Sequence, residues 1–463
     1  MALDRLATAR IVRLAPGRRR ALFRAVEHAE AATTLLHRRR ADAPAVPHPI
    51  ALTPFLVSRQ TMPGLARLAA LVHRLQAHAP LLWRADAGGF RALCPISEPT
   101  ARWLARDRVR GAAPWQLMIR PDVGLEARPG GTLQPVLFET NATALAGLYN
   151  HAAGVRILRA EVFPRVYRDT EARALADPPD LLALVVRWVQ AAARRLGRRR
   201  LRGVAFVEDT GPVDGYSEVP RLVAAFRMAG VPAAHGAPAD LRRARGGVRL
   251  GDLAVDVVYR DLALEDLGVP ETARTLGGFL ERFDAGAVLP GVAGEFSQKG
   301  LLEALGRPEV ARLFTTAERR LLGRIVPWTR VLGSRWTEDP AGRRIDLPEF
   351  VRRARERLLI KPNVGSSGAG VLLGREAGAS RWEARIARAC REPGRWVVQV
   401  RRPGTRRAVV YLRNGRAHAG PCYFSLGLFY APGDLGLHCR VSLEPIVNVA
   451  RRGAVACAFL TRP

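Results

Sequence analysis

The sequence predicts a mixed α+β and α/β protein, with a helical N-terminal region, a small parallel α/β unit and a strand-rich C-terminal part. Apolar residues recur at helical spacing through the first 110 residues, a strand–helix–strand rhythm runs from 201 to 261, and short apolar strands with turn signals follow 295. The chain has 463 residues, of which 48% are hydrophobic and 25% charged, which is enough for two or three domains with a substantial core. The expected divisions are 1–110, 111–200, 201–290 and 291–463.

The first two divisions are expected to contain helices followed by a pair of strands. Apolar residues at helical spacing predict helices around Leu22–Ala29 and over 65–82, and the proline-rich segment 41–54 connects them. Two strands are expected within 115–141, separated by a turn at Gly130-Gly131.

The middle of the chain is expected to form the α/β unit. Its expected elements are a helix over 181–200, a strand over 204–207, a helix from Ser217 to Gly230, a strand beginning at Val231 and a strand over 252–260. Strands that alternate with helices predict a parallel sheet. In the C-terminal part, strands are expected over 396–400, 409–412 and 416–419, and Asn414-Gly415 between the last two is a strong hairpin signal.

Composition narrows the classes of protein. The formal net charge of +31 is compatible with nucleic-acid binding, but the arginines are scattered in pairs and triplets without interleaved aromatic residues, and no nucleic-acid-binding motif occurs. The five cysteines form no C-x-x-C pair, so we expect reduced thiols in a cytoplasmic protein. No signal peptide is evident, and the most apolar run, Leu181–Val186, is too short to span a membrane.

Lysine is nearly absent from the chain. Of the 73 lysine and arginine residues, only Lys299 and Lys361 are lysine. A pocket that needs one compact ammonium against a phosphate oxygen would not accept the wide guanidinium fork of arginine. Lys361 ends the apolar run Leu358–Ile360 and opens the glycine-rich stretch 361–370, whose backbone N–H groups could cradle phosphates. The alternative is that an ordinary turn follows a lysine retained by chance.

Three oxygen-bearing residues suggest a metal site. Glu139 and Asn141 lie two apart in an expected strand and so share one face, and Asp122 can meet them from the neighbouring strand. Two carboxylates and an amide oxygen suit Mg²⁺. Solvated strand faces or turn caps are the alternative interpretation of these three residues.

Other candidates lie at strand ends. Gln399 and Val400 end an expected strand, where backbone groups could hydrogen-bond an adenine edge. Three arginines at or near strand ends could each hold a carboxylate or phosphate: Arg120, Arg260 and Arg440. No G-x-S-x-G, H-E-x-x-H, Walker or Rossmann pattern occurs.

Taken in order, these pieces resemble the circularly permuted ATP-grasp proteins, a family that includes glutathionylspermidine synthetase and uncharacterised bacterial relatives. The resemblance runs from about Arg120 to Asn448, with the candidate metal strand ahead of both lysines. Its blocks are Arg120-Pro121-Asp122, 138–148, 256–260, Ser297-Gln298-Lys299, 325–330, Lys361-Pro362-Asn363 with its glycine loop, 397–399 and Arg440-Val441-Ser442 with Asn448.

The resemblance implies a circularly permuted ATP-grasp fold and a site for ATP and Mg²⁺. It implies Asp122, Glu139 and Asn141 as Mg²⁺ ligands, Lys299 and Lys361 as phosphate contacts, and Arg120 as a group that stabilises phosphate charge. It also implies a flap over the triphosphate, formed by Gly365, Ser366, Ser367, Gly368 and Gly370, and an adenine hinge at Gln399 and Val400. Relatives often carry an acidic residue after Lys-Pro-Asn and a basic residue before the last glycine, where this chain has Val364 and Ala369.

Three functional hypotheses follow. The first is an ATP- and Mg²⁺-dependent carboxylate–amine ligase that acts through an acyl-phosphate on small-molecule or peptide-like substrates. The second, suggested by the altered flap, is an ATP-binding partner protein of a biosynthetic pathway that has lost ligase chemistry. The third is a basic nucleic-acid-binding protein. The sequence identifies neither substrate and does not indicate an oligomeric state.

Overall fold

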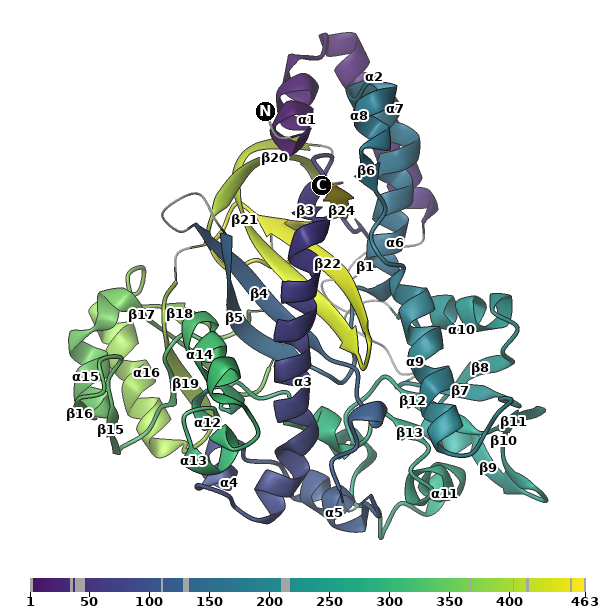
Figure 1. Cartoon of the computed structure of the whole chain (residues 1–463), viewed down its shortest axis with the longest axis vertical. Helices are drawn as coiled ribbons and strands as arrows, with labels where there is room; N and C mark the ends of the chain where they lie inside the picture. Colours follow the sequence, from purple (N-terminus) through teal and green to yellow (C-terminus); the bar gives the residue numbers. More distant parts are fainter. Residues whose placement is uncertain are drawn as a thin grey trace.

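A computed structural model describes residues 3–33, 36–37, 46–109, 111–127, 133–209, 217–365, 368–402, 404–413, 416–449 and 452–461. A long central antiparallel sheet occupies the middle of the molecule, with a smaller sheet on one side and the α/β unit on the other (Figure 1). No helix among the described residues is both long enough and apolar enough to cross a lipid bilayer.

The central sheet joins the middle of the chain to its C-terminal part. The strand order is β23-β22-β21-β4-β5, with β20 paired to β21. The strands are β4 (Arg120–Ala127), β5 (Leu133–Asn141), β20 (Arg406–Arg413), β21 (Arg416–Ala431), β22 (Asp434–Ser442) and β23 (Gly453–Ala456).

The register of this sheet sets the position of the candidate metal residues. In the antiparallel β4–β5 pair, Asp122 lies opposite Glu139 and Arg120 opposite Asn141. The predicted pair of strands within 115–141 is therefore confirmed, as are the hairpin strands β20 and β21. The turns predicted at Gly130-Gly131 and Asn414-Gly415 lie outside the described residues.

The N-terminal region is largely helical, as predicted. It contains α1 (Leu3–Arg13), α2 (Pro16–Ala32), α3 (Met62–Arg84), α4 (Phe90–Leu93) and α5 (Glu98–Arg106). Helix α3 runs along the central sheet (Figure 1) and packs against β21. Its buried stripe, which includes Leu65, Leu68 and Leu75, has the spacing of one helical face and contributes to the largest core cluster.

Several short strands tie distant parts of the chain together. β3 (Phe55–Ser58) pairs in parallel with β24 (Ala458–Thr461), which also pairs with β6 (Leu175–Ala176). β1 (Leu36–His37) pairs with β2 (Val46–Pro47). None of these strands was predicted, because such short segments carry little periodicity and no neighbouring helix marks them as part of an α/β unit. Because β3 pairs with β24, residues 55–58 share a sheet with residues 458–461.

Helices connect the central sheet to the α/β unit. They are α6 (Leu148–Ile157), α7 (Phe163–Val166), α8 (Asp169–Arg173) and α9 (Leu181–Arg195). The predicted helix over 181–200 is confirmed as α9, which ends five residues earlier. Its first turn is capped by Asp180, whose carboxylate accepts from the backbone N–H groups of Leu182 and Ala183.

The α/β unit has the predicted parallel sheet. The strand order is β13-β12-β7-β8, and the elements are β7 (Val204–Val207), α10 (Val219–Met228), β8 (Ala233–Gly236), β12 (Val257–Arg260), α11 (Gly277–Asp284) and β13 (Val288–Leu289). The single strand predicted over 252–260 is wrong. β11 (Leu253–Val255) belongs to a separate antiparallel sheet with β9 (Leu241–Ala244) and β10 (Gly247–Leu250).

The break between β11 and β12 falls at Asp256. The backbone N–H and side chain of Arg202 both donate to its carboxylate, and the Asp256 N–H donates to the carbonyl of Gly203. These contacts fix the residue between two sheets, and periodicity alone does not reveal such a change of partner.

The second sheet has the strand order β14-β19-β17-β18. Its strands are β14 (Thr329–Val331), β17 (Leu358–Pro362), β18 (Leu372–Leu373) and β19 (Trp396–Val400), and the predicted strand over 396–400 is thus confirmed. The surrounding elements are α12 (Leu301–Ala304), α13 (Pro308–Ala311), α14 (Thr316–Ile325), β15 (Trp336–Glu338), β16 (Arg344–Asp346), α15 (Leu347–Arg353) and α16 (Ala379–Arg391).

Alternation along β17 separates its two faces. Leu358 and Ile360 are buried in a core cluster with Trp382 of α16, whereas Leu359 and Lys361 line a cavity on the other face. This alternation directs the Lys361 side chain into the cavity.

Candidate active site

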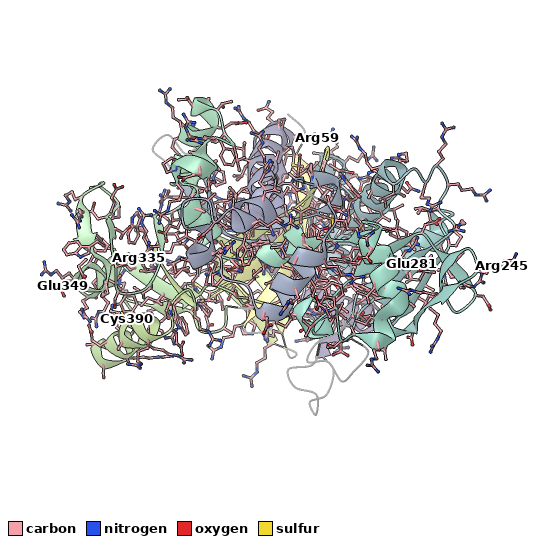
Figure 2. The ribbon with its side chains drawn as sticks, turned by 90° about the horizontal axis from the view of Figure 1, so that it is seen from below. Arg59, Arg245, Glu281, Arg335, Glu349 and Cys390 are labelled. Carbon is pink, nitrogen blue, oxygen red and sulfur yellow. The ribbon has the colours of Figure 1, made fainter. Side chains whose placement is uncertain are left out.

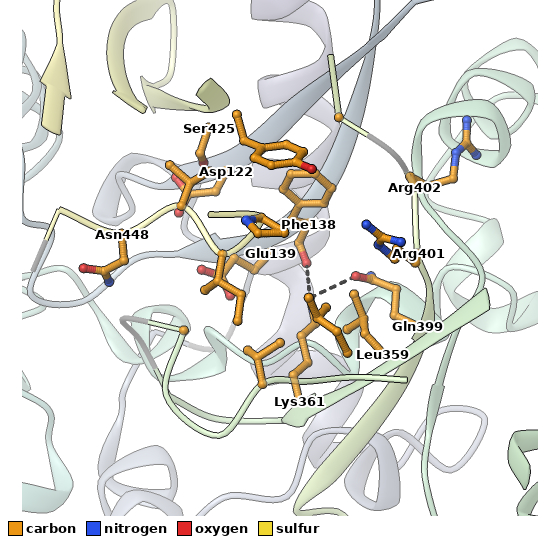
Figure 3. Close-up of a pocket in the computed structure, with 18 of the residues that line it drawn as sticks. Asp122, Phe138, Glu139, Leu359, Lys361, Gln399, Arg401, Arg402, Ser425 and Asn448 are labelled. Carbon is orange, nitrogen blue, oxygen red and sulfur yellow. Dashed lines mark hydrogen bonds between the residues drawn. The ribbon is translucent and has the colours of Figure 1, made fainter. Parts of the chain in front are cut away.

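A cavity lies between the central sheet and the second sheet (Figure 3). β4, β5, β21 and β22 supply residues from the central sheet, and β17, β18 and β19 supply residues from the second. The lining residues used below are Asp122, Phe138, Glu139, Leu359, Lys361, Gly368, Gln399, Val400, Arg401, Arg402, Ser425, Arg440, Ile446 and Asn448.

Lys361 is buried at the floor of this cavity. Its Nζ donates to the carbonyl oxygen of Phe138 at 2.8 Å and to Oε1 of Gln399 at 3.0 Å (Figure 3). Gln399 Nε2 in turn donates to Oγ1 of Thr329 at 2.8 Å, which fixes the amide with its oxygen toward the lysine. Burial lowers the pKa of Lys361 to about 7, with Lys299 adding to this effect and Glu139 opposing it.

Lys299 comes from a different segment and contacts Glu139, one of the residues that line the cavity. Its Nζ lies 3.2 Å from Oε2 of Glu139 and donates to the carbonyl oxygen of Gly365 at 2.9 Å. Glu139 lines the cavity, so the structure brings the two lysines of the chain to one place.

Asn363 holds the two lysine segments together. Its Oδ1 accepts from the Gly300 N–H at 2.7 Å, and its carbonyl oxygen accepts from the Lys299 N–H at 3.0 Å. Its Nδ2 donates to the carbonyls of Leu93 and Gly394. This positioning role was not predicted, although the residue lies directly after Lys361-Pro362.

Asp122 is held between two arginines. Oδ1 lies 3.1 Å from Nε of Arg120, and Oδ2 accepts from Nη2 of Arg440 at 2.7 Å and from Nδ2 of Asn141 at 3.3 Å. Although burial acts to raise it, the pKa of Asp122 is held below its ordinary value by the guanidinium groups of Arg120 and Arg440. Both carboxylate oxygens are thus engaged within the protein.

This arrangement bears on the predicted metal ligands. With its oxygens directed at arginines, Asp122 does not fit the ligand role expected from the sequence. Asn141 Nδ2 faces the Arg120 carbonyl and Asp122, which leaves its Oδ1 for another partner. Glu139 and Asn141 therefore remain the candidates among the three, with Oε2 of Glu139 3.2 Å from Nζ of Lys299. No group of three or more His, Cys, Asp or Glu side chains suited to a metal occurs among the described residues.

Arg260 is not brought to this cavity. Its fully buried guanidinium donates to the carbonyls of Leu262, Pro290 and Gly291 and lies 2.7 Å from Oε1 of Glu295. These contacts satisfy the side chain within the α/β unit. Arg120 and Arg440, by contrast, meet at Asp122, and Arg440 lines the cavity.

Gly368, in the glycine-rich stretch, lines the cavity. Gly365, Gly368 and Gly370 all have positive φ, and a Cβ at Gly368 would lie 2.4 Å from the Ile446 side chain, so this close approach requires glycine. Ser366 and Ser367 lie outside the described residues. Val364 is 57% exposed.

The sequence did not predict some lining residues. Arg401 and Arg402 follow the predicted hinge and add positive charge to the rim, where Arg402 pairs with Glu126. Arginines are so common in this chain that neither stood out by spacing.

No family model and no curated protein matches this sequence. The structure is similar to that of a glutathione synthetase-like effector from Globodera pallida in its apo form, with a TM-score of 0.65 and 10% identity over 97% of this chain and 99% of that one. It also matches a provisionally assigned gamma-glutamylcysteine synthetase from Methylobacillus flagellatus, with a TM-score of 0.41 and 14% identity over 87% and 89% of the two chains. The first likeness covers nearly all of both chains and shows that this chain shares the fold of that effector.

Proposed function

We propose that this protein is an ATP-dependent carboxylate–amine ligase of the circularly permuted ATP-grasp type. The observation that carries the proposal is the convergence of Lys299 and Lys361 on a cavity between two antiparallel sheets, beside Glu139. The likeness to a glutathione synthetase-like effector over nearly the whole chain supports it.

In this proposal the cavity holds ATP along its length. The ammonium groups of Lys299 and Lys361 and the glycine loop neutralise and surround the phosphates. Leu359, Val400 and Ile446 supply apolar walls for the adenine, and the backbone at Gln399 and Val400 binds its edge. Glu139 and Asn141 would hold Mg²⁺, which supplies positive charge to the phosphate oxygens.

The chemistry requires no nucleophile from the protein. A substrate carboxylate oxygen attacks the γ-phosphorus, ADP leaves, and the resulting acyl-phosphate loses inorganic phosphate to an attacking amine. The protein positions the reactants and neutralises charge through Lys299, Lys361 and Arg440. Asp122 and Arg120 hold Arg440 in place, and the glycine loop excludes water from the acyl-phosphate.

A Lys361→Ala variant tests the nucleotide site. Truncation removes the ammonium and leaves Gln399 Oε1 and the Phe138 carbonyl without their donor, so we expect Mg·ATP affinity measured by isothermal titration calorimetry to fall by about 100-fold. Arg320→Ala, which removes one exposed positive charge that does not line the cavity, is the matched control and should bind as wild type does. Equal affinities in all three proteins would refute the nucleotide site.

The altered flap favours a second candidate, an ATP-binding partner protein without turnover. Val364 is exposed at a position where ATP-grasp relatives often carry an acidic residue. A screen of amino acids and short peptides for ADP release, with mass detection of products, separates the two. Release with an amide product supports the ligase, and ATP binding without release under any substrate supports the partner protein.

A further inference from the structure

A concave basic groove lies on the α/β side of the molecule, apart from the cavity. The C-terminal end of α9, the loop after it and residues 229–232 after α10 form its walls, and its volume is about 670 Å³. Five arginines line it and no acidic residue does: Arg194, Arg198, Arg199, Arg200 and Arg202. The groove shares no lining residue with the cavity between the two sheets.

Intramolecular contacts account for only part of this charge. Arg202 donates to Asp256 at 2.7 Å, and Arg198 lies 3.9 Å from the same carboxylate oxygen. Arg194 is in the last turn of α9, where a positive charge complements the helix dipole. Arg199 and Arg200 are exposed and have no ion pair among the described residues. The one carboxylate in contact with these arginines, that of Asp256, therefore pairs with two of the five guanidinium groups.

An anionic partner would offset the remaining charge. Like charges about 4 Å apart repel by about 1 kcal/mol even in water, and a groove concentrates them. Each guanidinium can hold a carboxylate through two parallel hydrogen bonds. The lining also includes the apolar residues Leu201, Val231 and Pro232. A ligand that fits both features carries several carboxylates and interspersed aliphatic side chains.

We infer that this groove binds an acidic segment of a partner protein. The lining contains no aromatic side chain on which bases could stack. The arginines lie at a helix end and in the following loop, not along a helix face that could enter a nucleic-acid groove. Both observations favour a carboxylate-rich peptide over nucleic acid. The inference is independent of the proposed ligase activity.

Two arginine triplets allow a matched test. Arg198, Arg199 and Arg200 line the groove, whereas Arg18, Arg19 and Arg20 lie on helix α2 and line no described cavity. Replacing either triplet with glutamine removes three positive charges. Arg202 is left unchanged, because Asp256 is buried and would lose its main partner.

The probe is a fluorescein-labelled 12-residue peptide of Glu-Glu-Leu repeats, followed by anisotropy at physiological salt with the full chain. We expect the groove triplet variant to bind about tenfold more weakly than wild type, since each exposed ion pair contributes little by itself and three are lost, and the α2 triplet variant to bind as wild type does. A double variant of Arg199 and Arg200 should give a smaller loss in the same direction, and it serves if the triple variant does not fold.

Two results would overturn the inference. Equal weakening by both triplets would mean that the peptide responds to net charge and not to the groove. A single-stranded or duplex 20-mer DNA that binds more tightly than the peptide, and loses affinity only in the groove variant, would identify nucleic acid as the ligand.

Discussion

At the scale of the residue, the environment of Lys361 predicts a dependence of nucleotide binding on pH. Burial lowers the pKa of Lys361 to about 7, whereas phosphate oxygens favour the charged ammonium. Above pH 7 the side chain must therefore take up a proton when ATP binds. We expect Mg·ATP affinity to fall between pH 7 and pH 9, by at most about tenfold per pH unit. Calorimetry in buffers of different ionisation enthalpy measures the proton uptake directly.

Lys361→Ala is the control for this effect, because alanine does not titrate and the weaker affinity of this variant should lack the contribution of the lysine to the pH profile. ATP itself contributes equally to both proteins, so the difference between their pH profiles isolates the lysine. Identical profiles would contradict the proposed coupling. The lowered pKa also means that the unfolded chain binds more protons than the native chain between pH 7 and about 10.5, so this residue makes the ligand-free protein more stable as pH rises through that window.

Residue type alone predicted part of the candidate active site. The rarity of lysine pointed to Lys299 and Lys361, and the two-residue spacing of Glu139 and Asn141 placed them on one strand face. The role of Asp122 could not be read in the same way, because it depends on Arg440, 318 residues away. Arg260 shows the same limit. The sequence does not tell whether an arginine at the end of a strand contacts a ligand or, as here, three carbonyl groups.

At the scale of the element, the start of helix α6 depends on a residue of another helix. Gly147 precedes α6 with φ of 110° and has no side chain to cap it, and a Cβ there would lie 2.9 Å from the His438 ring. The carboxylate of Glu218, at the start of α10, instead accepts from the N–H groups of Gly147, Leu148, Tyr149 and Asn150 at 2.6–3.2 Å. Glu218 is only 6% exposed.

Glu218→Gln should therefore destabilise the protein. An amide offers one acceptor oxygen and turns an NH₂ group toward N–H donors, so we expect the free energy of unfolding to fall by about 2–3 kcal/mol in a denaturant titration. Glu98→Gln, in the first turn of α5 with a side chain that is 78% exposed, should change it by less than about 0.5 kcal/mol. Equal effects of the two substitutions would show that Glu218 is not an anchor of α6.

Periodicity predicted the longer elements and failed at short ones. Helices α3 and α9 have enough residues for their apolar spacing to be visible, and the short strands β7 and β8 have a helix between them that identifies the unit. β3, β6 and β24 do not, and their pairing is decided by which distant strand has an open edge. Asp256 divides what the alternation presents as one strand, because its carboxylate is committed to Arg202.

At the scale of the whole molecule, the cavity is built from segments that are far apart in the chain. Glu139 comes from β5 of the central sheet, Lys361 and Gln399 come from β17 and β19 of the second sheet, and Lys299 comes from the segment before α12. The Lys361–Phe138 hydrogen bond joins the two sheets, and the Lys299–Glu139 ion pair joins the segment before α12 to the central sheet. A nucleotide in the cavity would contact both sheets and connect them further.

This arrangement predicts that nucleotide stabilises the fold as a unit. A ligand that binds only the native state at 100 times its Kd adds about 2.7 kcal/mol, which for a chain of this length raises Tm by about 3 °C. We expect ATP and ADP to give this shift in scanning calorimetry and adenosine to give much less, because the two lysines bind phosphates. Lys299→Ala should abolish most of the ATP shift, whereas Arg320→Ala should retain it. If adenosine shifted Tm as much as ATP does, the lysines would not be the phosphate contacts and the two sheets would not be joined through the triphosphate.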